Sequence, residues 1–367
     1  MLRAVTARAA PLALACLLLA GGCGGDDRAA TGEQHTVREV LAVVEGLDGE
    51  ELTAKLAELA KAEGGRLQIY TSLSDEIGEE IANRFGDEYD VDVSIYAGNS
   101  NDVAQRLSEE TNAGRHNADL VEIGTPVLIA LGDDGMLAKG LPVDTDGIAE
   151  EVVDEGWVAV RHNRFAVSWN TKIVTPGTEP KRWEDLADPR WDGKLALELE
   201  EFDWYATLRQ YWLGQGKSEQ EVDRLFEAMA DGAKVIKGHS LLGQLTASGE
   251  VGVAASNFSH IVDRSTKDGA PITWKPVVEP AFLRAQGMGI AASSRRPATA
   301  ALFIQWALTK GQELYAQNGW VPARTSLQSR EGFEQVVVDV KAIAADEKRW
   351  VAEYERLVRR GTIVAED

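Results

Sequence analysis

A unit of strand, polar turn and helix recurs along this chain and constrains its fold more than any other feature. In the first unit, Leu67, Ile69 and Tyr70 are apolar or β-favouring, Ser72 and Ser74 lie in the turn, and apolar residues then recur at helical spacing. Similar units begin near residues 91 and 118. Successive strands separated by helices indicate a parallel sheet, because parallel neighbours need a long crossover connection. The sequence therefore predicts an α/β fold.

A second series of these units begins at residue 194. Its turns fall at residues 200–203, 238–240 and 256–257, and each is followed by a stretch with helical spacing. In open α/β sheets, ligands bind at the carboxyl ends of the strands, where such turns gather. We therefore expect two lobes whose polar turns meet across one cleft.

The first residues form a targeting segment rather than part of the fold. Two arginines precede an apolar run that is too short to span a bilayer, and the small-residue site Leu19-Ala20-Gly21-Gly22 ends at Cys23. This layout resembles the lipobox of bacterial lipoproteins, in which the cysteine is acylated. We expect residues 1–22 to be the signal peptide, Cys23 to carry the lipid, and residues 23–36 to be a flexible tether. An ordinary signal with an incidental cysteine is the alternative.

The composition limits both the partners of the protein and its means of stabilisation. The formal charge is −21, so nucleic acid and anionic lipid surfaces would repel the chain. Removal of the signal leaves Cys23 as the remaining cysteine, which excludes an internal disulfide. A chain of this length can instead build two lobes around apolar cores. Residues 37–65 predict a helical hairpin that either packs on the main body or serves as an adaptor.

Four segments, in this order, carry a resemblance to a known family. They are Ile69-Tyr70-Thr71-Ser72, residues 183–194 (WEDLADPRWDGK), residues 249–254 (GEVGVA) and residues 319–324 (GWVPAR). Over about residues 66–326, the chain resembles an extracellular solute-binding protein of an ABC importer, with the type II periplasmic-binding-protein fold. Within that fold it is similar to the branch that holds the ferric-ion-binding proteins.

The resemblance implies a two-lobed α/β architecture with hinge-linked parallel and mixed sheets. It assigns residues 66–165 and 279–330 to lobe 1, residues 166–278 to lobe 2, residues 331–367 to C-terminal helices, and hinge segments to regions near residues 166–170 and 274–280. Solute binding would shift the lobes toward a closed form that a permease and its ATPase recognise. The protein would act as a monomer outside the cytoplasm, lipid-anchored to the cell membrane, and would need no cofactor.

The site residues of the ferric branch are only partly present. That branch binds Fe(III) through a histidine after the first strand and two adjacent tyrosines after an asparagine in the second lobe. The matching positions here are Ser74, then Ser259 and His260 after Asn257. The phenolate ligands are missing, so Fe(III) binding by the usual set is not expected. Asn257 matches the asparagine that touches the bound anion in the family.

Other polar and aromatic residues supply a candidate solute site. Carboxylates beside aromatic rings, at Glu201, Asp203, Trp204 and Tyr205, suit a cationic organic solute through ion pairs and cation–π contacts. Alternatively, the carboxylates satisfy a helix start and the aromatic rings pack beneath it. The complete set of predicted solute-binding residues is Ser72, Ser74, Asn99, Asn101, Glu201, Asp203, Trp204, Tyr205, His239, Ser240 and Asn257.

Other functions remain as alternatives. His239 and His260 could combine with Glu201 or Asp203 in a metal site, which would make the protein a receptor for a metal ion or metal complex. The same fold could serve a membrane sensor instead of a transporter. A hydrolase is the least favoured function, because residues 238–243 miss the nucleophile elbow by one position.

Overall fold

The computed structural model describes residues 32–328 and 331–364. The expected signal peptide, Cys23 and most of the expected tether lie outside these ranges. Within them, no helix combines the length and the apolar character that crossing a membrane requires.

A mixed sheet of twelve strands carries the fold of the described residues. Along its main path the strands follow in the order β12 (Thr362–Val364), β6 (Lys234–Ile236), β5 (Leu195–Glu198), β7 (Val253–Phe258), β4 (Val158–Asn170), β9 (Ala281–Ile290), β3 (Leu120–Gly124), β1 (Arg66–Thr71) and β2 (Asp92–Ala97). Beside this path, β8 (Ile272–Thr273) and β10 (Val321–Pro322) pair with β4, and β11 (Gln335–Val337) pairs with β9.

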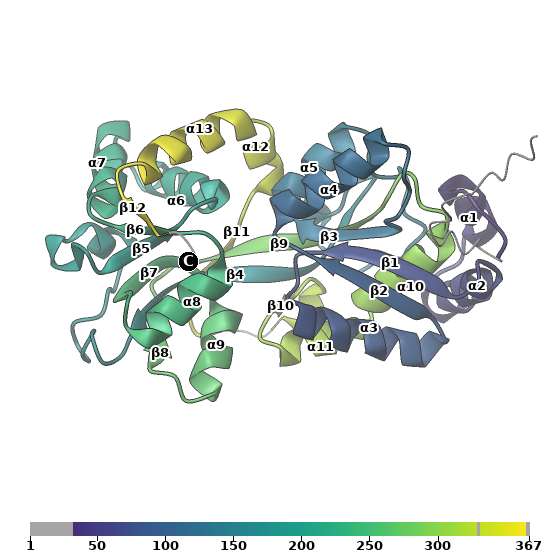
Figure 1. Ribbon diagram of the computed structural model, residues 1–367, viewed down its shortest axis with the longest axis horizontal. Helices are drawn as coiled ribbons and strands as arrows, with labels where there is room; N and C mark the ends of the chain where they lie inside the picture. The colour runs from purple at the N-terminus through teal and green to yellow at the C-terminus, as the bar shows by residue number, and fades with distance from the viewer. Residues whose placement is uncertain (1–31, 329–330, 365–367) are drawn as a thin grey trace, which may run out of the picture. The chain divides into compact units, whose positions relative to one another are not determined.

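The long strands β4 and β9 divide the sheet into halves and also join them. They pair with each other in antiparallel register from Val158 and Met288 to Phe165 and Phe282. On their other edges, β9 pairs with β3 in one half and β4 pairs with β7 in the other. We call the half with β1–β3 lobe 1 and the half with β5–β7 lobe 2 (Figure 1). The paired stretch of β4 that joins the lobes ends just before the expected hinge segment at residues 166–170. The paired stretch of β9 begins just after the other expected segment, residues 274–280.

Each lobe contains the parallel strands that the sequence predicts. In lobe 1, β1 is parallel to β2 and β3, and in lobe 2, β5 is parallel to β6 and β7. Because parallel strands end at the same edge, the turns that follow them gather there. The predicted α/β class and its two-lobed, mixed arrangement are confirmed. The hydrogen bonding of the described sheet continues from lobe to lobe through β4 and β9, so the two halves are not separate sheets.

Helices cover the sheet in both lobes (Figure 1). Those of lobe 1 are α3 (Asp75–Tyr89), α4 (Ser100–Asn112), α5 (Thr125–Asp133), α10 (Pro297–Leu308) and α11 (Gly311–Gln317). Those of lobe 2 are α6 (Phe202–Gly214), α7 (Glu219–Ala230), α8 (His239–Ser248) and α9 (Ser259–Lys267). Every residue of α10 is buried, because other elements cover this helix on all sides.

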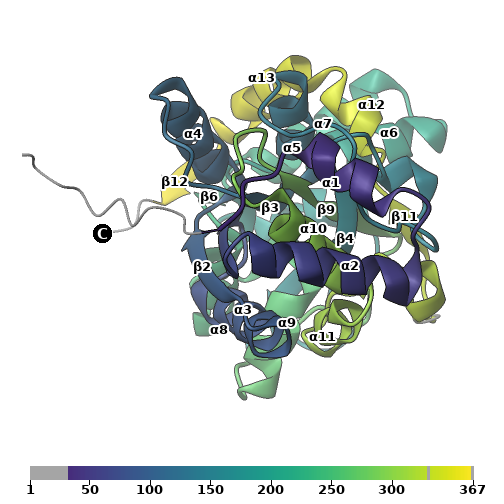
Figure 2. The same ribbon diagram turned by 90° about the vertical axis from the view of Figure 1, so that its right-hand side faces the viewer.

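The N-terminal hairpin packs on lobe 1 (Figure 2). It consists of α1 (Val37–Val44) and α2 (Gly49–Ala62), and α2 lies against α10. Glu63 follows α2 and is 2 % exposed. Its carboxylate accepts hydrogen bonds from the backbone N–H groups of Ala298 and Thr299, at 3.0 and 2.8 Å. These donors belong to the first turn of α10 and have no partner within that helix. The hairpin is therefore part of the main body.

The C-terminal segment runs along lobe 2. Helix α12 (Val340–Ala344) contacts both α5 and α6, and α13 (Glu347–Val358) packs on α6 and α7. The ring of Tyr354 in α13 lies 5.7 Å from the ring of Tyr205 in α6. Strand β12 then pairs with β6 at the edge of the sheet (Figure 1). This segment covers the face of lobe 2 that carries α6 and α7.

Candidate solute-binding site

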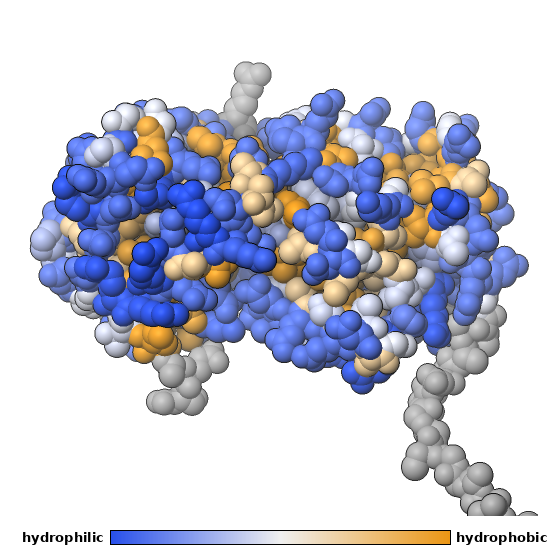
Figure 3. Space-filling model, turned by 90° about the horizontal axis from the view of Figure 1, so that it is seen from above, coloured by the Kyte–Doolittle hydropathy of each residue, from blue (hydrophilic) through white to orange (hydrophobic). Residues whose placement is uncertain are grey.

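The polar turns of the two lobes face a cavity of about 630 Å³. Its wall includes the first turns of α3, α4 and α5 from lobe 1 and of α6, α8 and α9 from lobe 2. Helix N-termini carry partial positive charge and backbone N–H groups without an intrahelical partner. Their gathering at this cavity favours a solute with anionic groups. Seen from above, the surface of the protein is mainly hydrophilic, with scattered apolar areas (Figure 3).

Lobe 1 contributes neutral polar groups to the wall. Ser72 and Ser74 line the cavity, and Ser74 stands at the N-cap of α3, but its hydroxyl accepts no hydrogen bond from that helix. By contrast, Asn99 caps α4, since its Oδ1 accepts from the backbone N–H of Asp102 at 2.9 Å. The Ser74 hydroxyl is therefore not engaged by the first N–H groups of α3.

Asn101 and Glu200 bring the two lobes into contact at the rim of the cavity. Asn101 Nδ2 donates to Glu200 Oε2 at 3.4 Å, and Lys237 Nζ lies 3.2 Å from Glu200 Oε1. The hydrogen bond with Glu200 raises the pKa of Lys237. The side chain of Lys237 is 52 % exposed, so water screens this ion pair. The contact that joins the lobes is the hydrogen bond from Asn101, which is weak because it is long and exposed.

Lobe 2 contributes a buried cluster of charges. Arg284 reaches in from β9, and its Nη1 lies 3.2 Å from Glu201 Oε1 and 3.0 Å from Asp203 Oδ2. Burial raises the pKa of both carboxyls, and the guanidinium acts against that shift. Buried charges are tolerated when they are paired and hydrogen-bonded. The carboxylates at the start of α6 thus have a cationic partner before any solute arrives.

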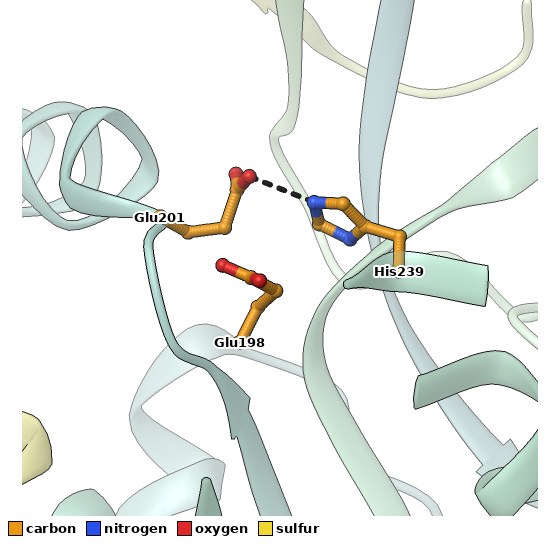
Figure 4. A group of neighbouring side chains, drawn as sticks. All are labelled: Glu198, Glu201 and His239. Atoms are coloured by element: carbon orange, nitrogen blue, oxygen red, sulfur yellow. Dashed lines mark hydrogen bonds and ion pairs between the residues drawn. The ribbon is translucent and has the colours of Figure 1, made fainter. Parts of the chain in front are cut away.

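Glu198, Glu201 and His239 converge on one part of this wall (Figure 4). His239 Nε2 lies 2.7 Å from Glu201 Oε1, and one potential ligand atom from each of the three residues lies within 4.8 Å of the others. Burial raises the pKa of Glu198 to about 7 and lowers that of His239 to about 4. His239 is therefore neutral at pH 7, which is the form that binds metal ions. His260 is not part of this group and instead packs against Trp320.

Arg161 and Arg264 add positive charge to the cavity. Arg161 on β4 pairs with Glu122 at 2.8 Å, and its guanidinium lies 4.3 Å from the centre of the Trp320 ring. Arg264 on α9 is half-buried and lines the cavity. Within residues 32–328 and 331–364, Arg264 forms no ion pair. Its charge is therefore available to an anion.

The structure brings most of the predicted site residues together. Those that line the cavity are Ser72, Ser74, Asn99, Asn101, Glu201, Asp203, His239 and Ser240, and His260 joins them. Trp204, Tyr205 and Asn257 do not line it. Cys23, the predicted lipidation site, lies outside the described residues.

Trp204 and Tyr205 belong to the core, and this overturns their prediction as part of a cation–π site. Trp204 is fully buried and packs against Trp183 and Phe226, and Tyr205 also packs against Phe226. Successive residues of a helix point about 100° apart, so Asp203 can face the cavity while Trp204 faces inward. The alternative, in which these rings pack beneath the helix start, is the one observed.

Asn257, a predicted solute-binding residue, does not line the cavity either. It is completely buried, and its Oδ1 accepts a hydrogen bond from the backbone N–H of Phe258 at 2.8 Å. This contact lies directly before α9. Asn257 therefore contacts the backbone just before α9 and does not line the cavity.

Several residues that line the cavity are absent from the set predicted from the sequence. They are Arg161, Glu198, Lys237, Arg264, Arg284, Gln286 and Trp320. Arg284 carried a usable signal, because a charged side chain in a largely apolar strand needs a buried partner, whereas Arg161 stands in a polar run of β4. Their partners Glu122 and Glu201 are distant in the sequence, so the pairing could not be read from it.

These features define a class of protein. Two α/β lobes that are joined by long shared strands and enclose a polar cavity form the architecture of the type II periplasmic binding proteins. Residues 80–342 match the family of bacterial extracellular solute-binding proteins, and the chain belongs to that family. It is an extracytoplasmic solute-binding component of the ABC-importer type.

Individual relatives agree with this assignment. The Fe(3+)-binding periplasmic protein of Serratia marcescens is 23 % identical over 274 residues, which cover 71 % of this chain and 79 % of that protein. AfuA of Actinobacillus pleuropneumoniae, solved with exogenous fructose-6-phosphate bound, has a TM-score of 0.70 at 22 % identity, over 81 % of this chain and 99 % of its own. Iron-bound HitA of Pseudomonas aeruginosa has a TM-score of 0.65 at 19 % identity, over 79 % and 99 %. The resemblance to the ferric branch is thereby confirmed.

Proposed function

We propose that the cavity captures a small polar solute carrying a phosphate or similar anionic group, for delivery to an ABC permease and its ATPase. The observation that carries this proposal is the gathering of helix N-termini from both lobes around the cavity that Arg264 lines. Oriented backbone N–H groups and a guanidinium bind phosphate oxygens through charge-assisted hydrogen bonds.

Helices α3, α8 and α9 are the parts of the wall best suited to an anion. In each of them, the side chain of the N-cap residue forms no hydrogen bond with the first turn. Helix α3 belongs to lobe 1, and α8 and α9 belong to lobe 2. An anion between them would satisfy donors of both lobes at once, and so it would bind the closed form better than an open one.

A cationic organic solute fits this cavity less well than the sequence suggested. Glu201 and Asp203 already pair with Arg284, and the aromatic rings that would complete a cation–π site lie in the core. A ferric ion would also lack phenolate ligands, because no tyrosine from the described part of the chain lines the cavity.

Hydroxyl groups on the solute would complement the remaining polar wall. Ser72, Asn101 and Ser240 offer neutral donors and acceptors, and Glu198 offers a strong acceptor. A phosphorylated sugar or polyol combines such hydroxyls with an anionic end. AfuA, which shares the fold, has fructose-6-phosphate bound. We therefore favour a phosphorylated polyol as the solute class.

Thermal denaturation with and without candidate solutes tests this proposal. Hexose phosphates, glycerol phosphate and inorganic phosphate are compared with free sugars and with a polyamine. A solute at 100 times its Kd stabilises the folded protein by about 2.7 kcal/mol. We expect phosphorylated compounds to raise the Tm, and Arg264→Ala to reduce that rise. Arg84→Ala is the control, because Arg84 lies on α3 with a side chain 65 % exposed. A rise with free sugars or the polyamine, but not with phosphates, would overturn the proposal.

Attachment to the membrane through Cys23 is part of the same proposal. It is supported by the arginines, apolar run and small residues that precede this cysteine. The lipid would hold the receptor near the permease. Expression of the full chain with Cys23→Ser should release it into the medium or periplasm, whereas the unaltered protein should sediment with membranes. Equal sedimentation of both proteins would contradict acylation.

A further inference from the structure

We propose that Glu198, Glu201 and His239 hold a divalent first-row transition-metal ion in the lobe 2 wall, and that this ion also binds the anionic group of the solute. The role toward the solute rests on the function proposed above, whereas the metal site itself does not. The two parts are therefore tested separately.

The geometry of the three side chains supplies the site. They come from the end of β5, the turn before α6 and the first residue of α8, and their side chains point toward one another (Figure 4). One potential ligand atom from each lies within 4.8 Å of the others. His239 and Glu201 already approach to 2.7 Å, a separation that two ligands of one ion can have. Small side-chain movements would bring all three onto a common centre.

The buried carboxyl groups at the site outnumber their cationic partners. Glu198, Glu201 and Asp203 are each at most 6 % exposed, and Arg284 is the cation that contacts this cluster within the described residues. Lys237 is directed to Glu200 at the rim. Arg284 contacts Glu201 and Asp203 but not Glu198, so the three buried carboxyl groups share one cationic partner. A divalent cation would give Glu198 and Glu201 a second one.

Each ligand is held in place by a second contact. The Glu198 carboxylate accepts from the backbone N–H groups of Gly238 and Glu200, at 2.8 and 2.5 Å. Arg284 holds Glu201, and a carboxylate has enough lone pairs to serve an arginine and a metal ion together. The His239 ring packs against the Phe258 ring, 3.7 Å between centres. Such supporting contacts orient the ligands of protein metal sites.

The donor set indicates which ions would bind. Two carboxylates and one imidazole suit Zn²⁺, Mn²⁺ or Fe²⁺ better than soft ions that prefer sulfur. Three protein ligands also leave coordination positions open, as in metal sites that bind an exogenous group. All three residues line the cavity, so an open position would face the solute. The site differs from the histidine and tyrosine set of the ferric branch, whose matching positions here are Ser74, Ser259 and His260.

Calorimetric titration of chelator-treated, untagged protein with Zn²⁺, and in parallel with Mn²⁺, tests the metal site. We expect one ion per chain in the absence of solute. His239→Gln and Glu198→Gln should each weaken binding by more than about 100-fold, because loss of a ligand exceeds the 10–100-fold cost of losing a supporting residue. The matched controls His116→Gln and Glu227→Gln, both at exposed positions, should bind like the unaltered protein. Circular dichroism checks that every variant is folded.

Absence of binding by either ion would overturn the site. Binding that survives unchanged in folded His239→Gln and Glu198→Gln would overturn it as well, because the ion would then lie elsewhere.

A second titration, with the phosphate compound that raises the Tm most, tests the role toward the solute. We expect its Kd to rise at least tenfold when the metal is removed by chelator and to recover when Zn²⁺ is restored. An unchanged Kd would overturn the bridging role but leave the proposed solute class intact. Failure of every phosphate compound to bind, with or without Zn²⁺, would instead refute the proposed function and with it the bridging role.

Discussion

The two walls of the cavity differ in the groups that they present to a solute. Lobe 1 offers hydroxyl and amide groups such as Ser74 and Asn101, whereas lobe 2 offers Glu201 and Asp203 already paired with Arg284. Neutral groups lose little hydration energy when they meet a ligand, but buried charges need their partners in every state. In the proposed site, lobe 2 therefore presents charges that are already paired, and lobe 1 adds neutral polar groups.

The largest expected effect comes from breaking the charge pairing of lobe 2. Arg284→Met leaves Glu201 and Asp203 buried without their cation, so the free energy of unfolding should fall by about 3–5 kcal/mol. Urea denaturation at neutral pH measures this change. Arg84→Met, at an exposed position of α3, should change stability by less than about 0.5 kcal/mol. A loss below about 1 kcal/mol for Arg284→Met would mean that lobe 2 does not depend on this pairing.

A buried, uncharged histidine on β4 can be compared with the buried charges of lobe 2. His162 on β4 is 3 % exposed, and burial lowers its pKa to about 4. The unfolded chain takes up this proton near pH 6.5, whereas the folded chain takes it up only near pH 4. The contribution of His162 to stability is therefore complete above about pH 6.5 and is lost as the pH falls toward 4, by about 3 kcal/mol in total.

His162→Gln should remove that part of the pH dependence. Urea denaturation between pH 4 and pH 7.5 should give a flatter curve for this variant than for the unaltered protein. His116→Gln, at an exposed position, should leave the curve unchanged. If His162→Gln and the unaltered protein gave the same slope, the buried ring would contribute nothing to acid sensitivity.

Substitution in the neutral wall should affect solute binding without affecting stability. Ser74→Ala removes a hydroxyl that no group of α3 uses, so stability should stay within about 0.5 kcal/mol. Loss of one hydrogen bond to the solute should raise its Kd by about 5- to 10-fold, as judged by calorimetry. Ser94→Ala on β2 is the control and should leave the Kd unchanged. A large loss of stability in Ser74→Ala would place this residue among the structural ones.

The smallest effect is expected at the rim, where the two walls touch. Glu200→Gln weakens the long, exposed hydrogen bond that Glu200 accepts from Asn101 across the lobes, and such surface contacts contribute at most about 1 kcal/mol. The fraction of closed molecules, measured by energy transfer between labelled lobes, should change by less than about fivefold. The change should shrink further at high salt. A larger, salt-insensitive change would make the rim a determinant of closure.

The parts of the fold that follow from local pattern could be predicted from the sequence. Alternating or continuous apolar runs, followed by polar turns and helical spacing, located the units that contain Ser72, Asn99 and His239, because each unit is only about 20 residues long. Turns at the ends of parallel strands share one edge, so these residues could be placed at one cavity before the structure was seen.

The parts that depend on helix phase or on distant pairing could not be predicted. Asp203 and Trp204 are neighbours in sequence, yet one faces the cavity and the other the core, and apolar residues on several sides of α6 conceal which face is inward. Arg284 meets Glu201 from a strand that begins about 80 residues later. No local sequence pattern indicates this ion pair, so the cationic partner of the two carboxylates cannot be predicted from the sequence.

The carboxylate of Glu63 has a mechanical consequence. It fastens the hairpin of α1 and α2 to α10, so the N-terminal end of the described chain enters the molecule through lobe 1. A pull on that end would be borne by lobe 1, and β4 and β9 would be the flexure on which lobe 2 swings. Lobe 2, with its paired charges, would then move, and lobe 1, with its hydroxyl groups, would stay fixed.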